Sequence, residues 1–123
     1  MSDSAQLKSR TKQFALRIMR VVDALPKTTS GRAIGNQLVR AGTAVGANYR
    51  AACRGRSKAE FIAKLGIVVE EADESAYWLE LIMEADLLPR TKIEPLHKEA
   101  NELAAIFVAS VRTARSSINN QKS

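Results

Sequence analysis

This chain of 123 residues lacks most features from which an enzymatic or membrane function is usually inferred. It has one cysteine, so no disulfide can form within it, and no window approaches about 18 uninterrupted apolar residues, so no membrane-spanning helix is expected. The N-terminal MSDSAQLKSR has no apolar core of a secretory signal. These absences predict a reducing, cytoplasmic setting without a membrane partner.

Catalytic signatures are also missing. Glu94 and His97 have the Glu-x-x-His spacing of di-metal bundles, but such a centre needs two of these motifs and the chain has one histidine. Cys53 lies among arginines without a second histidine to act as its base. No glycine-rich phosphate loop accompanies them, and nothing beside Glu70, Glu71 and Glu74 suggests a nucleophile or a pocket. We therefore predict no catalytic residue, no metal site, no cofactor and no enzymatic activity.

Proline and aromatic residues are scarce, and what remains is typical of helices. Aromatic residues make up 5% of the chain, there are three prolines, and hydrophobic residues reach 46%. Alanine, leucine, glutamate and arginine favour helix formation. The length and composition predict one compact domain over residues 10–119, with flexible tails at 1–9 and 120–123.

Two amphipathic segments fill the first half. The first starts near Arg10 and ends at Leu25-Pro26, because proline lacks the N–H that a helix needs. The second starts at Ser30, a predicted N-cap, and ends near Cys53. Its stretch 41–47, AGTAVGA, is so rich in small residues that another element must approach it closely. The expected core residues of both segments are Phe14, Ile18, Val21, Val22, Leu25, Ile34, Leu38, Ala41, Val45, Tyr49 and Ala52.

Two more segments fill the second half. The longest runs from Ser57 to Asp86 and begins with a capping box in which Ser57 and Glu60 satisfy each other's N–H groups. The last begins with a similar box of Thr91 and Glu94. Four helices with short connections predict an all-α, antiparallel up-down-up-down four-helix bundle. The expected core residues here are Phe61, Leu65, Val68, Ala72, Ala76, Leu79, Met83, Leu96, Ala100, Leu103, Ile106, Phe107, Ser110, Ala114 and Ile118.

Charge is segregated along the chain, whose net charge is +6. Residues 1–64 hold thirteen Lys or Arg against three acids, and residues 65–123 hold six against ten, so the two parts carry +10 and −4. Opposite the core of the second segment we expect an arginine stripe of Arg32, Arg40, Arg50 and Arg54, continued by Arg56. The stripe has three interpretations: a solvated face, a partner for Glu70, Glu71 and Glu74, or a surface for RNA or DNA.

The 57–86 helix has a second face opposite its predicted core face. Because two large aliphatic residues and a tryptophan align there at helical spacing, an interface between subunits is predicted. The alternative is a set of isolated surface apolar residues, which monomers also show. We call this surface the outer face; its predicted interface residues are Ile67, Glu70, Glu71, Glu74, Trp78 and Leu81.

Several motifs together resemble the bacterial four-helix-bundle family encoded in intervening sequences of 23S ribosomal RNA genes. They are Leu25-Pro26, GNQLVRA at 35–41, VGAN at 45–48, SKAEFIAKL at 57–65, and the run from Glu71-Ala72 to YWLEL at 77–81. The resemblance covers roughly residues 14–110. It implies a small cytoplasmic bundle that forms a homo-oligomer, a pentameric ring, with no cofactor and no established enzymatic activity.

A related branch resembles the accessory variability protein of diversity-generating retroelements, which pairs with a reverse transcriptase and contacts nucleic acid through a basic surface. Many relatives have a glutamate shortly after the asparagine matching Asn48, whereas this chain has Arg50 and Arg54 there. We expect a non-enzymatic homo-oligomeric scaffold whose basic surface binds RNA or DNA without sequence specificity. The alternative is an accessory subunit for a protein partner, such as a polymerase or reverse transcriptase, without nucleic-acid affinity of its own.

Overall fold

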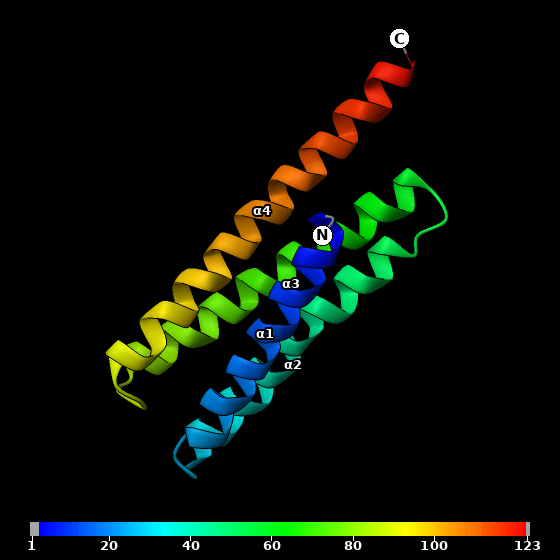
Figure 1. Cartoon of the computed structure of the whole chain (residues 1–123). Helices are drawn as coiled ribbons and strands as arrows, with labels where there is room; N and C mark the ends of the chain where they lie inside the picture. The colour runs from blue at the N-terminus through cyan, green and yellow to red at the C-terminus, as the bar shows by residue number, and fades with distance from the viewer. Residues whose placement is uncertain (1–2, 123) are drawn as a thin grey trace.

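The structure, a computed structural model, describes residues 3–122, and side chains as far as residue 119. Four helices make up this part of the chain: α1 (Asp3–Ala24), α2 (Thr29–Cys53), α3 (Lys58–Glu84) and α4 (Arg90–Lys122). Each is antiparallel to the next, and the α1–α2 and α3–α4 turns lie at one end of the bundle (Figure 1). The predicted all-α up-down-up-down bundle is confirmed.

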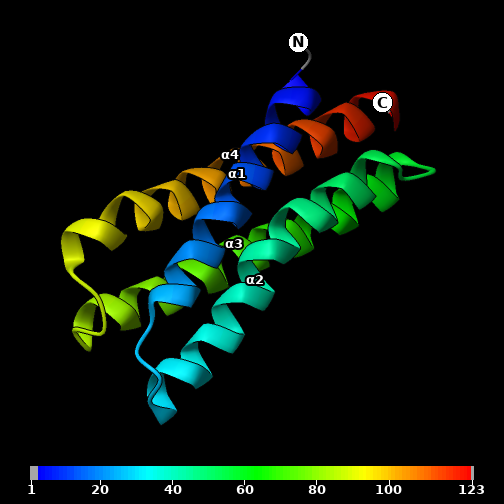
Figure 2. The ribbon, with the colours of Figure 1, turned by 60° about the horizontal axis from the view of Figure 1, so that its bottom comes forward.

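Neighbouring helices pack in chain order around the core. α3 packs extensively against both α2 and α4, α1 packs mainly on α2, and the contact between α1 and α4 is the least extensive (Figure 2). The backbones of the diagonal pairs, α1 with α3 and α2 with α4, are not in close contact in the described part of the chain. The outer sides of α1 and α3 therefore point away from each other.

The core contains the predicted apolar stripes. Phe14 and Ile18 of α1, Leu38 and Val45 of α2, and most of the predicted α3 and α4 residues are buried. Phe61, Ile106, Ser110 and Ile118 are only half-buried. Four fully buried residues were missing from the prediction, among them Ser75 and Ile82 of α3. Ile93 lies in the first turn of α4, and Thr11 is buried in α1 with its hydroxyl donating to the Leu7 carbonyl over 2.8 Å.

The small residues of α2 accommodate α1. A Cβ atom at Gly42 would lie 2.7 Å from Cγ1 of Ile18, and one at Gly46 would lie 3.1 Å from Oγ1 of Thr11. Both distances are shorter than ordinary van der Waals contact. The close approach predicted from stretch 41–47 is therefore made by α1.

Three predicted helix starts require correction. α1 begins at Asp3 rather than near Arg10, and α4 extends to Lys122; residues 1, 2 and 123 lie outside the described part. Thr28, not Ser30, caps α2, because its hydroxyl accepts the Gly31 N–H at 3.1 Å. α4 already includes Thr91, so the capping box proposed there is wrong.

The predicted ends of α3 are nearly right. Ser57 accepts the Glu60 N–H at 3.1 Å, as expected. The helix stops at Glu84, two residues early, because Asp86 has a left-handed backbone with φ of 55°. The N–H of Leu87 donates to the Ile82 carbonyl at 3.0 Å, which closes the helix end as a Schellman motif.

Candidate interaction surfaces

Arg40 of the arginine stripe contacts the acidic row of α3, which consists of Glu70, Glu71 and Glu74. Its guanidinium lies 3.4 Å from Glu71 and forms a short hydrogen bond with Glu74. At Arg40 the stripe is therefore an electrostatic partner of the acidic residues of α3 within the same chain. This was one of the three interpretations of the stripe. Arg40 is not free to bind a polyanion while these contacts persist.

The other predicted arginines remain available. Arg32, Arg50, Arg54 and Arg56 are exposed, and no ion pair to any of them exists among the described side chains. α2 has three arginines and no acidic residue, whereas α3 has seven acids and two lysines. The charge segregation seen in the sequence thus becomes a basic face on one helix and an acidic face on its neighbour.

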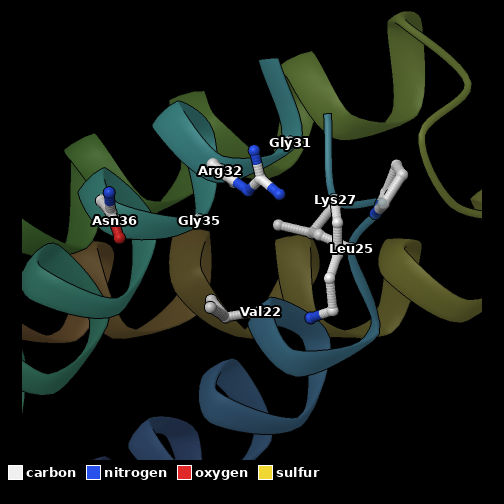
Figure 3. A pocket seen from close by; sticks show the side chains of 8 residues that line it. Val22, Leu25, Lys27, Gly31, Arg32, Gly35 and Asn36 are labelled. Carbon is white, nitrogen blue, oxygen red and sulfur yellow. The ribbon is translucent and has the colours of Figure 1, made fainter. Parts of the chain in front are cut away.

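Two pockets lie between α1 and α2. The first has a volume of about 250 Å³ and occupies the end near the α1–α2 turn. Its apolar side is built by Val22, Leu25 and Pro26, while Lys27 and Arg32 place amino and guanidinium groups around it (Figure 3). We call this the turn pocket.

The second pocket, of about 210 Å³, lies on the same pair of helices toward the N-terminus of α1. We call it the N-terminal pocket. Its cations are Lys8 and Lys12 from α1 and Arg50 from α2, and small residues such as Ala15 and Ala47 line it between them. Sequence analysis missed both lysines, because their place beside Arg50 in one pocket depends on how α1 packs on α2. Their i, i+4 spacing was the only available signal.

The outer face of α3 is only partly exposed. Ile67 is 40% exposed and Glu70 is exposed, but Leu81 is half-buried and Trp78 packs against the core. The indole Nε1 of Trp78 donates to Glu74 over 3.2 Å. Trp78 therefore stabilises the bundle of its own subunit, in addition to any contact that it makes with a partner.

Tyr77 is the exposed aromatic residue that sequence analysis missed. It is 52% exposed, and its ring lies edge-on to Trp78 with centroids 5.1 Å apart. On a helical wheel it lies beside Glu70, at the edge of the outer face, so the helical period was the signal that could have found it. With Ile67 it supplies the exposed apolar surface of α3.

Glu71 has an unusual environment. Its side chain is largely shielded from solvent, and the nearby Glu74 adds a like charge. Burial, followed by that repulsion, raises the pKa of Glu71 above its ordinary value although Arg40 acts in the opposite direction. Arg40 thus offsets only part of the cost of two neighbouring carboxylates.

Glu94, His97 and Cys53 each contact neighbouring residues of the bundle. Glu94 lies 3.7 Å from Arg90, and Nε2 of His97 lies 3.3 Å from a carboxylate oxygen of Glu80. Cys53 is half-buried and packs against the core. Among the described residues there is no group of three or more His, Cys, Asp or Glu side chains able to hold a metal ion, and no helix suited to crossing a membrane.

The fold and these surfaces define an all-α four-helix bundle. The family described as "23S rRNA-intervening sequence protein" matches residues 4–109, and the chain belongs to this family. A solved structure from Bacteroides thetaiotaomicron, described as a protein with unknown function from the S23 ribosomal protein family, is similar. It is 32% identical with a TM-score of 0.79, over 85% of this chain and 96% of that one. Curated proteins include no significant match.

Proposed function

We propose that this protein is a non-enzymatic homo-oligomeric scaffold whose basic surface binds RNA or DNA without sequence specificity. The oligomer is expected to be a cytoplasmic ring of five subunits, as the family resemblance implies. The observation that carries the proposal is the placement of an acidic, partly apolar face on α3 and of cations on α1 and α2 that form no ion pair with a described side chain.

The apolar part of the proposed subunit interface comes from two helices. α3 exposes Ile67 and Tyr77, and α1 exposes Leu16 (39%) and Met19 (44%). Exposed apolar residues that cluster between charged groups are typical of protein interfaces. We propose that the outer face of α3 in one subunit packs on α1 of the next.

Charge and geometry favour this pairing. Glu70 and Asp73 are exposed on α3, and Arg20 is exposed on α1 beside Met19. α1 and α3 occupy diagonal positions in the bundle, so a contact between them across subunits joins two different surfaces. A contact between α3 and the α1 of a neighbour is therefore head-to-tail, and a head-to-tail contact forms a closed ring when its rotation closes.

The nucleic-acid part of the proposal rests on cations that have no partner within the described chain. Arg32, Arg50, Arg54 and Arg56 are exposed, and arginine binds phosphate through two parallel hydrogen bonds. No aromatic side chain lines either cation-bearing pocket between α1 and α2. Binding through the phosphate backbone, without base stacking, is the expected mode.

A titration tests this function. Fluorescence anisotropy of labelled 20-base-pair DNA of two unrelated sequences, and of the corresponding RNA, should give similar affinities at 50 mM salt. The affinity should fall steeply toward 200 mM salt, because binding releases counterions. Absence of binding at 50 mM salt, or binding that ignores salt, would contradict the nucleic-acid role.

The accessory-subunit alternative predicts a different result. Affinity purification of the tagged protein with and without nuclease separates the two functions. A protein partner retained at full yield after nuclease treatment, combined with no affinity for the labelled nucleic acids, would favour the alternative. Loss of co-purifying material on nuclease treatment agrees with the proposed function.

A further inference from the structure

We infer that the nucleic-acid backbone lies along the seam between α1 and α2, with phosphates in the turn pocket and in the N-terminal pocket. This inference rests on the proposed nucleic-acid function and locates its binding site. It assigns phosphate contacts to Lys8, Lys12 and Lys27, which the arginine stripe did not include. It also removes Arg40 from the site.

The cations of both pockets are unpaired. Neither Lys8, Lys12 and Arg50 in the N-terminal pocket nor Lys27 and Arg32 in the turn pocket form an ion pair with a described side chain. Arg40, on the same helix, turns instead to the carboxylates of α3. The available positive charge of α2 is thus on the side that borders α1.

Concavity strengthens this charge. A hollow lined by groups of one sign, with low-dielectric walls, focuses the field and concentrates counterions. In the N-terminal pocket the hollow exists because Ala15 and Ala47 have short side chains, while Gly46 brings α2 close to α1. The longer side chains of Lys8 and Arg50 stand around it. A phosphate can therefore approach three cations at once.

The two pockets belong to one linear site. Both are lined by α1 on one side and α2 on the other. Arg32 and Arg50 are eighteen residues apart on α2, which corresponds to about 27 Å along a helix. At about 3.4 Å per step of a DNA strand, that span equals about eight steps. A linear polyanion reaches both pockets, whereas a single small anion does not.

The test compares two variants with the same loss of charge. The seam variant is Lys8→Gln/Lys12→Gln/Arg50→Gln, and the control is Lys92→Gln/Lys98→Gln/Arg112→Gln, whose three cations are exposed on α4 and also unpaired among the described side chains. Affinity for a 20-base-pair DNA duplex is measured over a range of salt concentrations. The seam variant should reduce the slope of log affinity against log salt by about 2.7, or 0.9 per lost phosphate contact, and the control by less than about 1.

A second pair of variants tests the seam without removing cations. Ala47→Glu places a carboxylate in the N-terminal pocket, and Ala105→Glu places one on α4; both alanines are exposed, so the fold should tolerate either change. Ala47→Glu should weaken binding to the duplex at least tenfold more than Ala105→Glu. Circular dichroism confirms that each variant is folded.

The other outcomes each decide the matter. Equal slopes in the seam variant and the control would show that net charge alone drives binding, so the seam inference would be wrong while the nucleic-acid function stands. Failure of the unaltered protein to bind would remove the function and the seam together. A seam variant that changes the mass of the assembly would assign the seam to a subunit contact and overturn the inference.

Discussion

Gly42 and Gly66 both lie inside long helices, yet their surroundings differ completely. A Cβ atom on Gly42 would lie within 2.8 Å of two side-chain carbons of Ile18, whereas one on Gly66 would meet nothing within 4 Å. The sequence predicted that a neighbour approaches the 41–47 stretch. It could not identify that neighbour as α1, because the contact depends on which faces of two separate helices meet.

Alanine at these two positions should have opposite effects on stability. Gly42→Ala overpacks the α1–α2 contact and should lower the free energy of unfolding by about 1–3 kcal/mol. Gly66→Ala removes the entropic cost of a helical glycine at a half-buried site with room for a methyl group, and it should raise the free energy of unfolding by about 0.5–1 kcal/mol. Chemical denaturation followed by circular dichroism measures both. Equal changes in the same direction would contradict the α1–α2 packing.

Glu71 should make stability depend on pH. Its pKa is raised in the folded protein, so the folded state holds this proton more tightly than the unfolded state. The stability it contributes is present below its ordinary pKa and is lost as pH rises through the raised value. Glu71→Gln should remove this pH-dependent loss and so stabilise the protein at pH 7. The gain should be less than about 1 kcal/mol, because the variant also loses the ion pair with Arg40.

Unfolding measured between pH 4 and 7 tests this prediction. Relative to Glu71→Gln, the unaltered protein should become less stable as the pH increases. Glu84→Gln is a suitable control because Glu84 is exposed and forms no ion pair with a described side chain. A relative stability that increased with pH would mean that Arg40 dominates the environment of Glu71.

At the scale of elements, the long apolar stripes were predictable and the first turns were not. Residues 3–9 offer only Leu7 as an apolar anchor, so periodicity gave no reason to extend α1 there. What holds this end is distant in sequence: Arg10 donates to Glu99 through two nitrogens, at 2.8 and 2.7 Å, and to Glu102 at 2.9 Å. Such long-range ion pairs leave no periodic signal in a single sequence.

The Arg10 contacts should therefore control the N-terminal turns of α1. Because α1 touches α4 less than any other neighbouring pair, Arg10→Ala should increase hydrogen exchange over residues 3–12 while α2 and α3 keep their protection. The global cost should be about 1 kcal/mol and should shrink at high salt. Asp23→Ala, at an exposed site of the same helix without an ion pair to a described side chain, should leave exchange there unchanged; equal effects of the two variants would contradict this role of Arg10.

At the scale of the whole molecule, the bundle and its core were predictable because they follow from helical periods and short connections. The surfaces were only partly predictable. The stripe and the acidic row were correctly placed on neighbouring helices, but their mutual contact at Arg40 depends on helix rotation. The same rotation turns Trp78 toward the core and leaves Tyr77 exposed. The lysines of α1 join the basic surface only through the α1–α2 packing.

The structure also changes the choice of interface variant. Trp78→Glu would damage the bundle itself, because the indole packs against the core and binds Glu74. Ile67 and Tyr77 are more exposed, so Ile67→Glu/Tyr77→Glu alters the proposed interface with little effect on the fold. Ala105→Glu/Ala109→Glu introduces the same charge on exposed positions of α4 and serves as the control.

The mass of the assembly in solution tests the central proposal most directly. Light scattering coupled to gel filtration should give the unaltered protein and the α4 control a mass near five times the 13.5 kDa of one chain. Ile67→Glu/Tyr77→Glu should be folded by circular dichroism and should elute with the mass of one chain. A monomeric unaltered protein, or a double variant that keeps the full mass of the assembly, would contradict a scaffold assembled through the outer face of α3.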